Sequence, residues 1–419
     1  MPDFNTAFTT YPWTFSIKGD MNSSFSFPLS RRRFLHWASA VTGAVTLGAR
    51  HTLYSTDSPI YVVPPETFIR HTAERQFIGP AVLEVRRGDL WMTAPWGRPP
   101  TDFREVKRFS LPPRLFRSAD NGRTWRESGR LKMRYDLAGI ISDGGITLIR
   151  LQGGRLMATF HRNVYEFHGG GVPAISFSDN HGHSWSPARL VQDREDVFYV
   201  MNERTIQMKS GRLVIPVAHK PVDLLLEKYV EGDRCLGRCF WSDDEGITWR
   251  LGQPAVLNDE RGMAEPVVAE LSDRSLIMLA RTGSGSHHCS FSHDGGETWS
   301  EPKPTTLRAA CSPLTLKRLP NGHLFLAYNP AKPLFPGSFF PRRPLAYSLS
   351  LDDGKKWSNP VVIDDVAGQQ LIYPSITFLP EGILFVYSAH YDPGDGKFHH
   401  NPDAYRYGGG KRCVIPYPS

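Results

Sequence analysis

The chain has 419 residues and a net charge of +7, with 40% hydrophobic and 22% charged residues, a balance that excludes a wholly disordered chain and a multi-span membrane protein. Its 37 glycines and 34 prolines favour many short strands joined by turns over long helices. Beyond the first fifty residues the basic residues form no run, so a nucleic-acid partner is not indicated, whereas a small anionic substrate is compatible with the charge.

The N-terminal segment carries the first recognisable pattern. An arginine run at residues 31–33 precedes Leu35–Ala49, a stretch of mostly apolar and small residues that is short for a membrane span. The arrangement resembles a twin-arginine export signal, although a solvated basic turn before a helix would look similar. We expect residues 1–50 to be a signal region and residues 51–419 the folded domain. The mature protein is then expected to be periplasmic or extracellular, with no membrane span.

Five copies of an eight-residue pattern, Ser-x-Asp-x-Gly-x-Thr-Trp, follow along the rest of the chain, with Asn180 and Ser184 in the second copy and Lys356 in the fifth as the departures. An aspartate or asparagine can accept backbone N–H groups in a turn, glycine permits a positive φ, and tryptophan can pack the turn onto a strand layer. We therefore interpret the pattern as a structural hairpin turn. The copies lie at residues 118–125, 178–185, 242–249, 292–299 and 350–357.

A second repeat alternates with these boxes and consists of a turn followed by a leucine that begins an apolar strand. The turn leucines are spaced by 48 to 66 residues, which predicts an all-β fold, a six-bladed β-propeller. The sixth unit has no box, so we expect its closing strand to come from Ile60–Val63 or from Arg412–Ile415. The turn segments are 87–90, 153–156, 210–213, 273–276, 321–324 and 381–384.

Together the two repeats resemble the sialidase superfamily, whose six-bladed propellers carry Asp-box (BNR) repeats, over roughly residues 65 to 400. The resemblance implies a retaining glycoside hydrolase that acts on terminal sialic acid or a related acidic sugar, with no organic cofactor. Propellers that are not sialidases also carry such boxes. A non-catalytic glycan-binding propeller, and a hydrolase or lyase of another acidic polysaccharide, therefore stay open.

Glu265 and Tyr373 each lie eleven residues before a turn leucine, as do Gly79, Gly145 and Asn202. Equivalent positions of inner strands approach one axis, so we expect the two side chains to meet at the channel mouth. Family sialidases use a tyrosine nucleophile with a glutamate base, and the segments around Tyr373 and Glu265 are similar to theirs. A hydrogen-bonded channel tyrosine and a glutamate in a structural ion pair are the alternatives.

Arginines are the expected partners of a substrate carboxylate, because a guanidinium presents paired donors in one plane. By resemblance, Arg281 and Arg342 bind that carboxylate. Arg204 and Asn202, from the inner register of the third unit, are further substrate-binding candidates. The first unit reads Ile-Gly-Pro around Gly79, where the family has an arginine. The residues that could replace it are Arg70, Arg75 and Arg98.

The remaining candidates are an acid and a group of thiols. Asp102, in a proline-rich loop, corresponds loosely to the family's acid/base aspartate, although it could simply cap its own turn. The five cysteines are odd in number and scattered, so no disulfide framework is indicated. Cys235 and Cys239, with His287, His288 and Cys289, could be drawn as a metal site, but buried thiols in strands are the preferred interpretation. We predict no metal.

Overall fold

The folded part of the chain consists of antiparallel β-strands. In the computed structural model the described residues are 63–72, 75–97, 114–131, 133, 140–141, 146–163, 171–193, 196–223, 228–229, 234–396 and 408–418. All of them belong to one unit, Ser58–Ser419. Within these ranges there is no α-helix, and hence no helix of the length and hydropathy needed to cross a membrane. The expected export signal and Asp102 lie outside the described residues.

Four sheets have four strands each, and most of their strands follow one another as hairpins. The first sheet contains β3 (Ala81–Arg86), β4 (Asp89–Ala94), β6 (Arg114–Ser118) and β7 (Arg126–Arg130). The second contains β20 (Ala264–Glu270), β21 (Leu276–Arg281), β22 (Ser286–Ser292) and β23 (Lys303–Arg308). The third contains β24 (Thr315–Arg318), β25 (Leu324–Tyr328), β26 (Leu345–Ser350) and β27 (Val361–Asp364). The last pairs β28 (Gln369–Leu379), β29 (Gly382–Tyr391), β30 (Gly409–Ile415) and β1 (Val63–Arg70).

A ten-stranded sheet contains two further runs of four paired strands. The first run is β9 (Thr147–Arg150), β10 (Leu156–Asn163), β11 (Gly171–Ser178) and β12 (Arg189–Leu190). The second is β14 (Ile206–Gln207), β15 (Leu213–Lys220), β18 (Leu236–Ser242) and β19 (Arg250–Leu251). β13 (Val197–Tyr199) joins the runs by pairing with β11 and β15. β8 (Ile140–Ile141) pairs with the end of β10. Two short ribbons pair β2 (Gln76–Phe77) with β5 (Trp96–Gly97) and β16 (Val222–Asp223) with β17 (Lys228–Tyr229).

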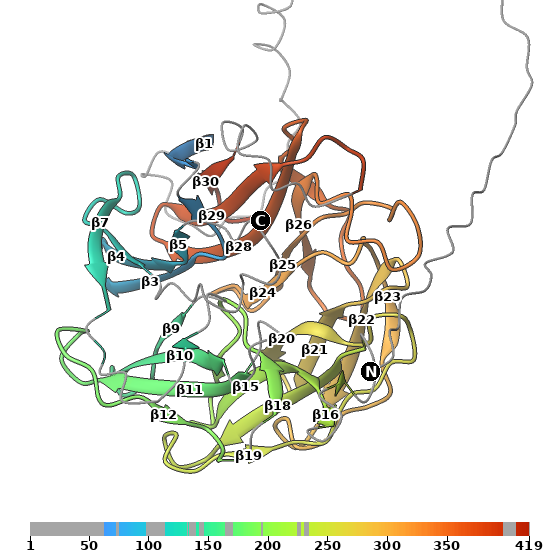
Figure 1. Ribbon diagram of the computed structural model, residues 1–419, viewed down its shortest axis with the longest axis horizontal. Coiled ribbons are helices and arrows are strands. Elements are labelled where there is room, and N and C mark those ends of the chain that lie inside the picture. Colours follow the sequence, from blue (N-terminus) through green and yellow to red (C-terminus); the bar gives the residue numbers. More distant parts are fainter. Residues whose placement is uncertain are drawn as a thin grey trace, which may run out of the picture. The chain divides into compact units, whose positions relative to one another are not determined.

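The first strands β3, β9, β20, β24 and β28 of five runs lie toward a common centre (Figure 1). Figure 1 shows the sheets placed around that centre in chain order, from β3 and β4 in blue to β28 and β29 in red. β28 contacts both β3 and β24, β3 contacts β9, and β20 contacts β24. This radial packing of antiparallel sheets is that of a β-propeller. The apolar cores lie between neighbouring sheets, as where Leu90 and Met92 of β4 meet Leu384 and Val386 of β29.

Each box forms the hairpin turn that the sequence predicts. In the fourth box, Ser292 Oγ donates to Asp294 Oδ1 at 2.7 Å, and the backbone N–H of Gly296 donates to Ser292 Oγ at 2.8 Å. The Asp294 carboxylate also accepts the N–H of Thr298 at 2.9 Å and its hydroxyl. Because the five boxes connect the third and fourth strands of their runs, they fix the outer hairpins and lie away from the inner strands.

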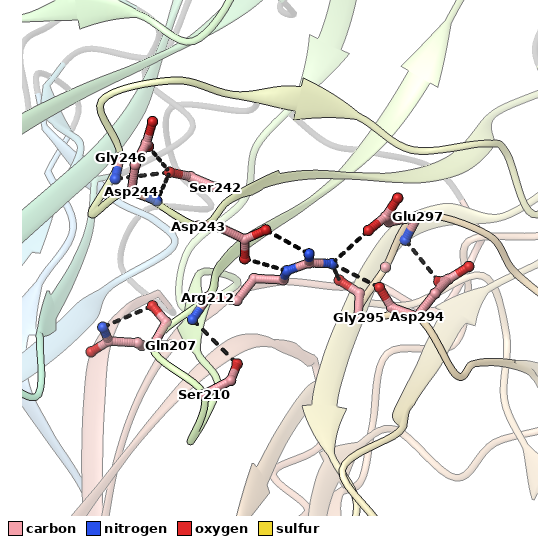
Figure 2. Close-up of polar contacts among 12 residues, drawn as sticks. Gln207, Ser210, Arg212, Ser242, Asp243, Asp244, Gly246, Asp294, Gly295 and Glu297 are labelled. Carbon is pink, nitrogen blue, oxygen red and sulfur yellow. Dashed lines mark hydrogen bonds and ion pairs between the residues drawn. The ribbon is translucent and has the colours of Figure 1, made fainter.

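Arg212 shows how neighbouring hairpins are tied together (Figure 2). Its guanidinium donates in bidentate fashion to the Asp243 carboxylate, at 2.6 and 2.7 Å, and to the carbonyl of Asp294 in the next box at 2.7 Å. It also lies 4.1 Å from the Trp241 ring centre. Similar arginine contacts join other pairs of runs, at Arg150 to Val85, Arg189 to Gly246, Arg318 to the carbonyl of Glu270, and Arg412 to Gly122.

The two ends of the described chain close the last sheet together. β30 pairs with β29, and β1 then pairs with β30 as the outermost strand. The sequence offered Ile60–Val63 and Arg412–Ile415 as alternatives. β30 contains the second candidate, whereas β1 only begins at Val63, the last residue of the first, and residues 60–62 lie outside the described residues. The missing sixth box follows from this topology, since the third and fourth strands come from opposite ends and no hairpin joins them.

Candidate functional site

A left-handed backbone position recurs along the inner strands. The φ angles are 54° at Gly79, 55° at Glu203, 41° at Glu265 and 53° at Tyr373. A non-glycine residue there costs about 1–2 kcal/mol, so three bulky side chains are kept at a conformation that glycine adopts freely in the first sheet. Counting from the turn leucine had assigned Asn202 to this register. That alignment is wrong by one residue, because the left-handed residue of the third run is Glu203.

Glu265 lies between a tyrosine and an arginine at the inner ends of β20, β21 and β28. Tyr373 Oη donates to Glu265 Oε1 at 3.2 Å, and the Arg281 guanidinium pairs with the same oxygen at 2.8 Å. Glu265 Oε2, Arg281 Nε and one terminal nitrogen of Arg281 are buried without a hydrogen-bond partner among the described residues. Buried polar atoms normally have partners, so these atoms could bind a polar ligand.

Electrostatics keep the phenol neutral at ordinary pH. Burial, and then the charge of Glu265, raise the pKa of Tyr373 to about 12, whereas nearby arginines favour the phenolate. Burial is the largest influence on Arg281 and opposes its charged form, but the Glu265 carboxylate together with the nearby Cys311, Tyr373 and Cys235 holds the arginine pKa above its ordinary value. The phenol therefore carries no charge until a base accepts its proton.

Arg204 and Arg342 are two further buried cations around this pair. Burial lowers the pKa of each to about 10, so both stay protonated near neutral pH. Arg204 donates to the carbonyl of Leu314 and is 2% exposed, and its charge acts on both Tyr373 and Glu265. Arg342 is 4% exposed and donates through Nε to the carbonyl of Phe339 at 3.0 Å.

A cavity of about 200 Å³ opens beside Glu265 and Arg281. The rest of its described wall combines two cations, two aromatic rings and small apolar groups. Burial raises the pKa of Cys235 to about 11 and also raises that of Cys311, so these two wall thiols are uncharged. The other wall residues are Tyr199, Ala218, Lys220, Cys235, Arg261, Ala264, Cys311 and Phe339.

Asn202 and Glu203 join neighbouring sheets. Asn202 Nδ2 donates to the carbonyl of Pro80 at 2.7 Å, a contact that accounts for its burial. The Glu203 carboxylate accepts the Ser375 hydroxyl at 2.5 Å and the backbone N–H of Ile376 at 3.0 Å. Sequence reasoning missed this role of Glu203, which fixes the chain just after Tyr373.

The first sheet contributes no arginine at Gly79, as the sequence indicates. Of the possible replacements, Arg70 is an exposed residue of outer strand β1, and Arg75 lies 3.9 Å from Glu127 near the outer strand β7. Arg98, like Asp102, falls outside the described residues. The described part of the first sheet thus offers none of the expected guanidiniums to the cavity.

The thiol and histidine residues do not gather into a metal centre. All five cysteines are free, and four of them are buried. The part of the chain that the structure describes contains no group of three or more His, Cys, Asp or Glu side chains able to hold a metal. Cys239 belongs to an apolar cluster with Met278, whereas Cys235 lines the cavity.

Two cavity residues, Arg261 and Phe339, were not identified from the sequence. Arg261 lies in a turn four residues before Glu265, and its backbone N–H is held by the Asp259 carboxylate at 2.8 Å. Phe339 precedes Arg342 in an irregular segment. Neither residue belongs to a repeat, and the only available signal was nearness in sequence to candidates already chosen.

Comparison with known proteins identifies the family and the fold. Residues 146–386 match the model of the BNR repeat-like domain family. The anhydrosialidase of Macrobdella decora is 30% identical over 157 residues, which cover 35% of this chain. The matched region spans 19% of the length of that curated relative.

Solved structures share the fold at low identity. A protein of unknown function from Dyadobacter fermentans has a TM-score of 0.61 at 16% identity, covering 85% of this chain and 99% of its own. The NanB sialidase of Streptococcus pneumoniae has a TM-score of 0.56 at 12% identity, covering 87% and 71%. The family model spans more than half of the chain, and the five boxes form the expected turns. The chain belongs to the BNR repeat-like domain family, within the sialidase superfamily.

Proposed function

We propose that this protein is a sialidase-like retaining glycoside hydrolase that acts on terminal sialic acid or a related acidic sugar. The observation that carries the proposal is the 3.2 Å hydrogen bond from Tyr373 to Glu265, within a group of buried guanidiniums. A sugar acid brings a carboxylate to the reacting carbon, so a carboxylate nucleophile would be repelled. A neutral phenol becomes charged only as its proton leaves.

In the first step Tyr373 Oη attacks the anomeric carbon while Glu265 accepts the phenol proton. The bond to the leaving oxygen breaks, and that oxygen receives a proton from an acid, the role proposed for Asp102. In the second step water attacks the same carbon, gives a proton to the conjugate base of that acid, and releases Tyr373, which regains its proton from Glu265. Two inversions give net retention, as in other double displacements.

Arg281 and Arg342 are proposed to hold the substrate carboxylate. Arg342 is buried and Arg281 is largely buried, and their charges influence Tyr373 and each other. A bound anion would offset the repulsion between them, and charge-assisted hydrogen bonds are stronger than neutral ones. The unpartnered nitrogen atoms of Arg281 are consistent with this role. Asn202 and Arg204 stay proposed substrate contacts at the same end of the inner strands.

The architecture and location are part of the proposal. The six runs of four paired strands support a ring of six blades within residues 51–419. The arginine run at residues 31–33 supports a signal region over residues 1–50 and export of the folded protein. Replacing that run with lysines should leave the protein inside a bacterial host, whereas unchanged export would refute the signal assignment.

A non-catalytic glycan-binding propeller is the second candidate. The observation that favours it is Gly79, which leaves the first sheet without the arginine that the family uses at this place. A hydrolase or lyase of another acidic polysaccharide is compatible with the same absence.

The deciding experiment is a screen of the purified protein against aryl glycosides of several acidic sugars, with Tyr373→Phe measured in parallel. Release of the aryl group by the wild type but not by the variant would support the proposal. Absence of release from every glycoside, together with binding on a glycan array, would replace it with the second candidate.

A further inference from the structure

Three guanidiniums surround the ring of Phe339. The Cζ atom of Arg261 lies 4.3 Å from the ring centre, that of Arg342 lies 5.5 Å away, and that of Arg281 lies 5.6 Å away. The face of an aromatic ring carries negative charge and attracts cations within about 6 Å. One ring therefore offsets part of the repulsion among three like charges.

Backbone contacts hold the three segments in register. The Asp259 carboxylate accepts the N–H of Arg261 and, through its other oxygen, that of Gly283 at 2.8 Å. The carbonyl of Gly283 in turn accepts the N–H of Gly337 at 3.0 Å. These bonds connect the turn before β20, the end of β21 and the segment that carries Phe339, so the cation group is built on a cross-linked frame.

The cavity beside this group carries excess positive charge. Its described wall includes Lys220, Arg261 and Arg281 against the single carboxylate of Glu265. Arg261 is only partly buried, so a ligand in the cavity can reach its guanidinium. Close opposite charges in a site shielded from water attract more strongly than in solution, which suits an anionic ligand.

We propose that Arg261 is a third anion-binding guanidinium of the site, and that Phe339 is a positioning residue that sets it beside Arg281 and Arg342. Arg261, Arg281 and Arg342 together bind the carboxylate of the acidic sugar. The first sheet has Gly79 at the position where an arginine was expected. This inference rests on the proposed substrate class but not on catalytic activity.

The test is calorimetric titration with the methyl α-glycoside of N-acetylneuraminic acid and with its methyl ester, which lacks the negative charge. The wild type should bind the acid more tightly than the ester. Arg261→Met should weaken binding of the acid by about 10- to 100-fold, the range for a charged hydrogen bond, and leave the ester unchanged. Phe339→Leu keeps Arg261 but should also weaken binding of the acid relative to the ester.

The control is Arg343→Met, a partly exposed neighbour whose guanidinium pairs with Asp365 at 2.9 Å, and it should change neither affinity. If Arg261→Met does not fold, Arg261→Lys keeps the charge and loses the planar donor pair, and it should give a smaller loss of acid binding. Wild-type discrimination that survives in the folded Arg261 variants would overturn this inference alone. A wild type that binds neither ligand would overturn the proposed sugar-acid specificity itself, and the inference with it.

Discussion

Tyr373→Phe is the sharpest test of the proposed chemistry, because it removes one hydroxyl and keeps the ring. The lost contact is the 3.2 Å hydrogen bond to Glu265, whose Oε1 still pairs with Arg281 at 2.8 Å. The carboxylate is therefore not left alone, and the free energy of unfolding should fall by only about 0.5–1.5 kcal/mol. With an unfolding entropy of about 2.1 cal/mol/K per residue over the unit Ser58–Ser419, the Tm should drop by about 1–2 °C.

The effect on turnover should be far larger. If the hydroxyl is the nucleophile, its loss removes the covalent route, and kcat should fall by at least about 10³-fold, equivalent to about 4 kcal/mol in the barrier. The assay is kcat on the best aryl glycoside from the screen, measured together with Tm and with the affinity for the sugar acid. Affinity should change little, because the guanidiniums remain.

Tyr328→Phe is the matched control. Tyr328 is also a buried tyrosine, 2% exposed, but its hydroxyl contacts Ser348 at 3.2 Å instead of Glu265. Both variants should lose similar stability, and only Tyr373→Phe should lose turnover. A folded Tyr373→Phe protein that keeps kcat within about tenfold of the wild type would refute the nucleophile assignment.

Three further predictions concern stability. Asp294→Ala should lower the free energy of unfolding by about 1 kcal/mol, and Asp294→Asn by less, since Asn180 naturally makes the corresponding bonds to Ser184; equal losses in denaturant titration would contradict this. Glu203→Gln should cost about 1–3 kcal/mol through weaker charged hydrogen bonds, and an unchanged urea midpoint would show that its inter-sheet contacts add nothing. Burial lowers the pKa of His71 from 6.5 to about 4, so the unfolded chain binds that proton first, and stability should fall as pH drops from about 6.5 toward 4. His71→Gln should lessen this loss of Tm, and an identical pH curve would refute the assignment.

Local sequence patterns were sufficient to predict the repeated turns. The bonds of a box close within eight residues, as between Ser292, Asp294 and Thr298, so residue types at fixed spacing were sufficient to predict the turns. The register that suggested Glu265 and Tyr373 as equivalent positions is equally local, because each residue is counted from the turn leucine of its own hairpin. The family resemblance and the candidates Arg281 and Arg342 rest on segments of the same short kind.

Tertiary structure decided what depends on contacts between distant residues. The pairing of β1 with β30 joins residues about 350 positions apart, and local patterns could not predict that both ends of the chain complete the last sheet. In the third run one residue fewer separates the left-handed position from the residue that pairs with the turn leucine, so Glu203 takes the conformation that counting predicted for Asn202. The Phe339 ring contacts the guanidiniums of Arg261, Arg281 and Arg342, which come from three separate segments. Such groupings depend on how the sheets pack around the centre. The spacing of residues within a single segment does not contain that information.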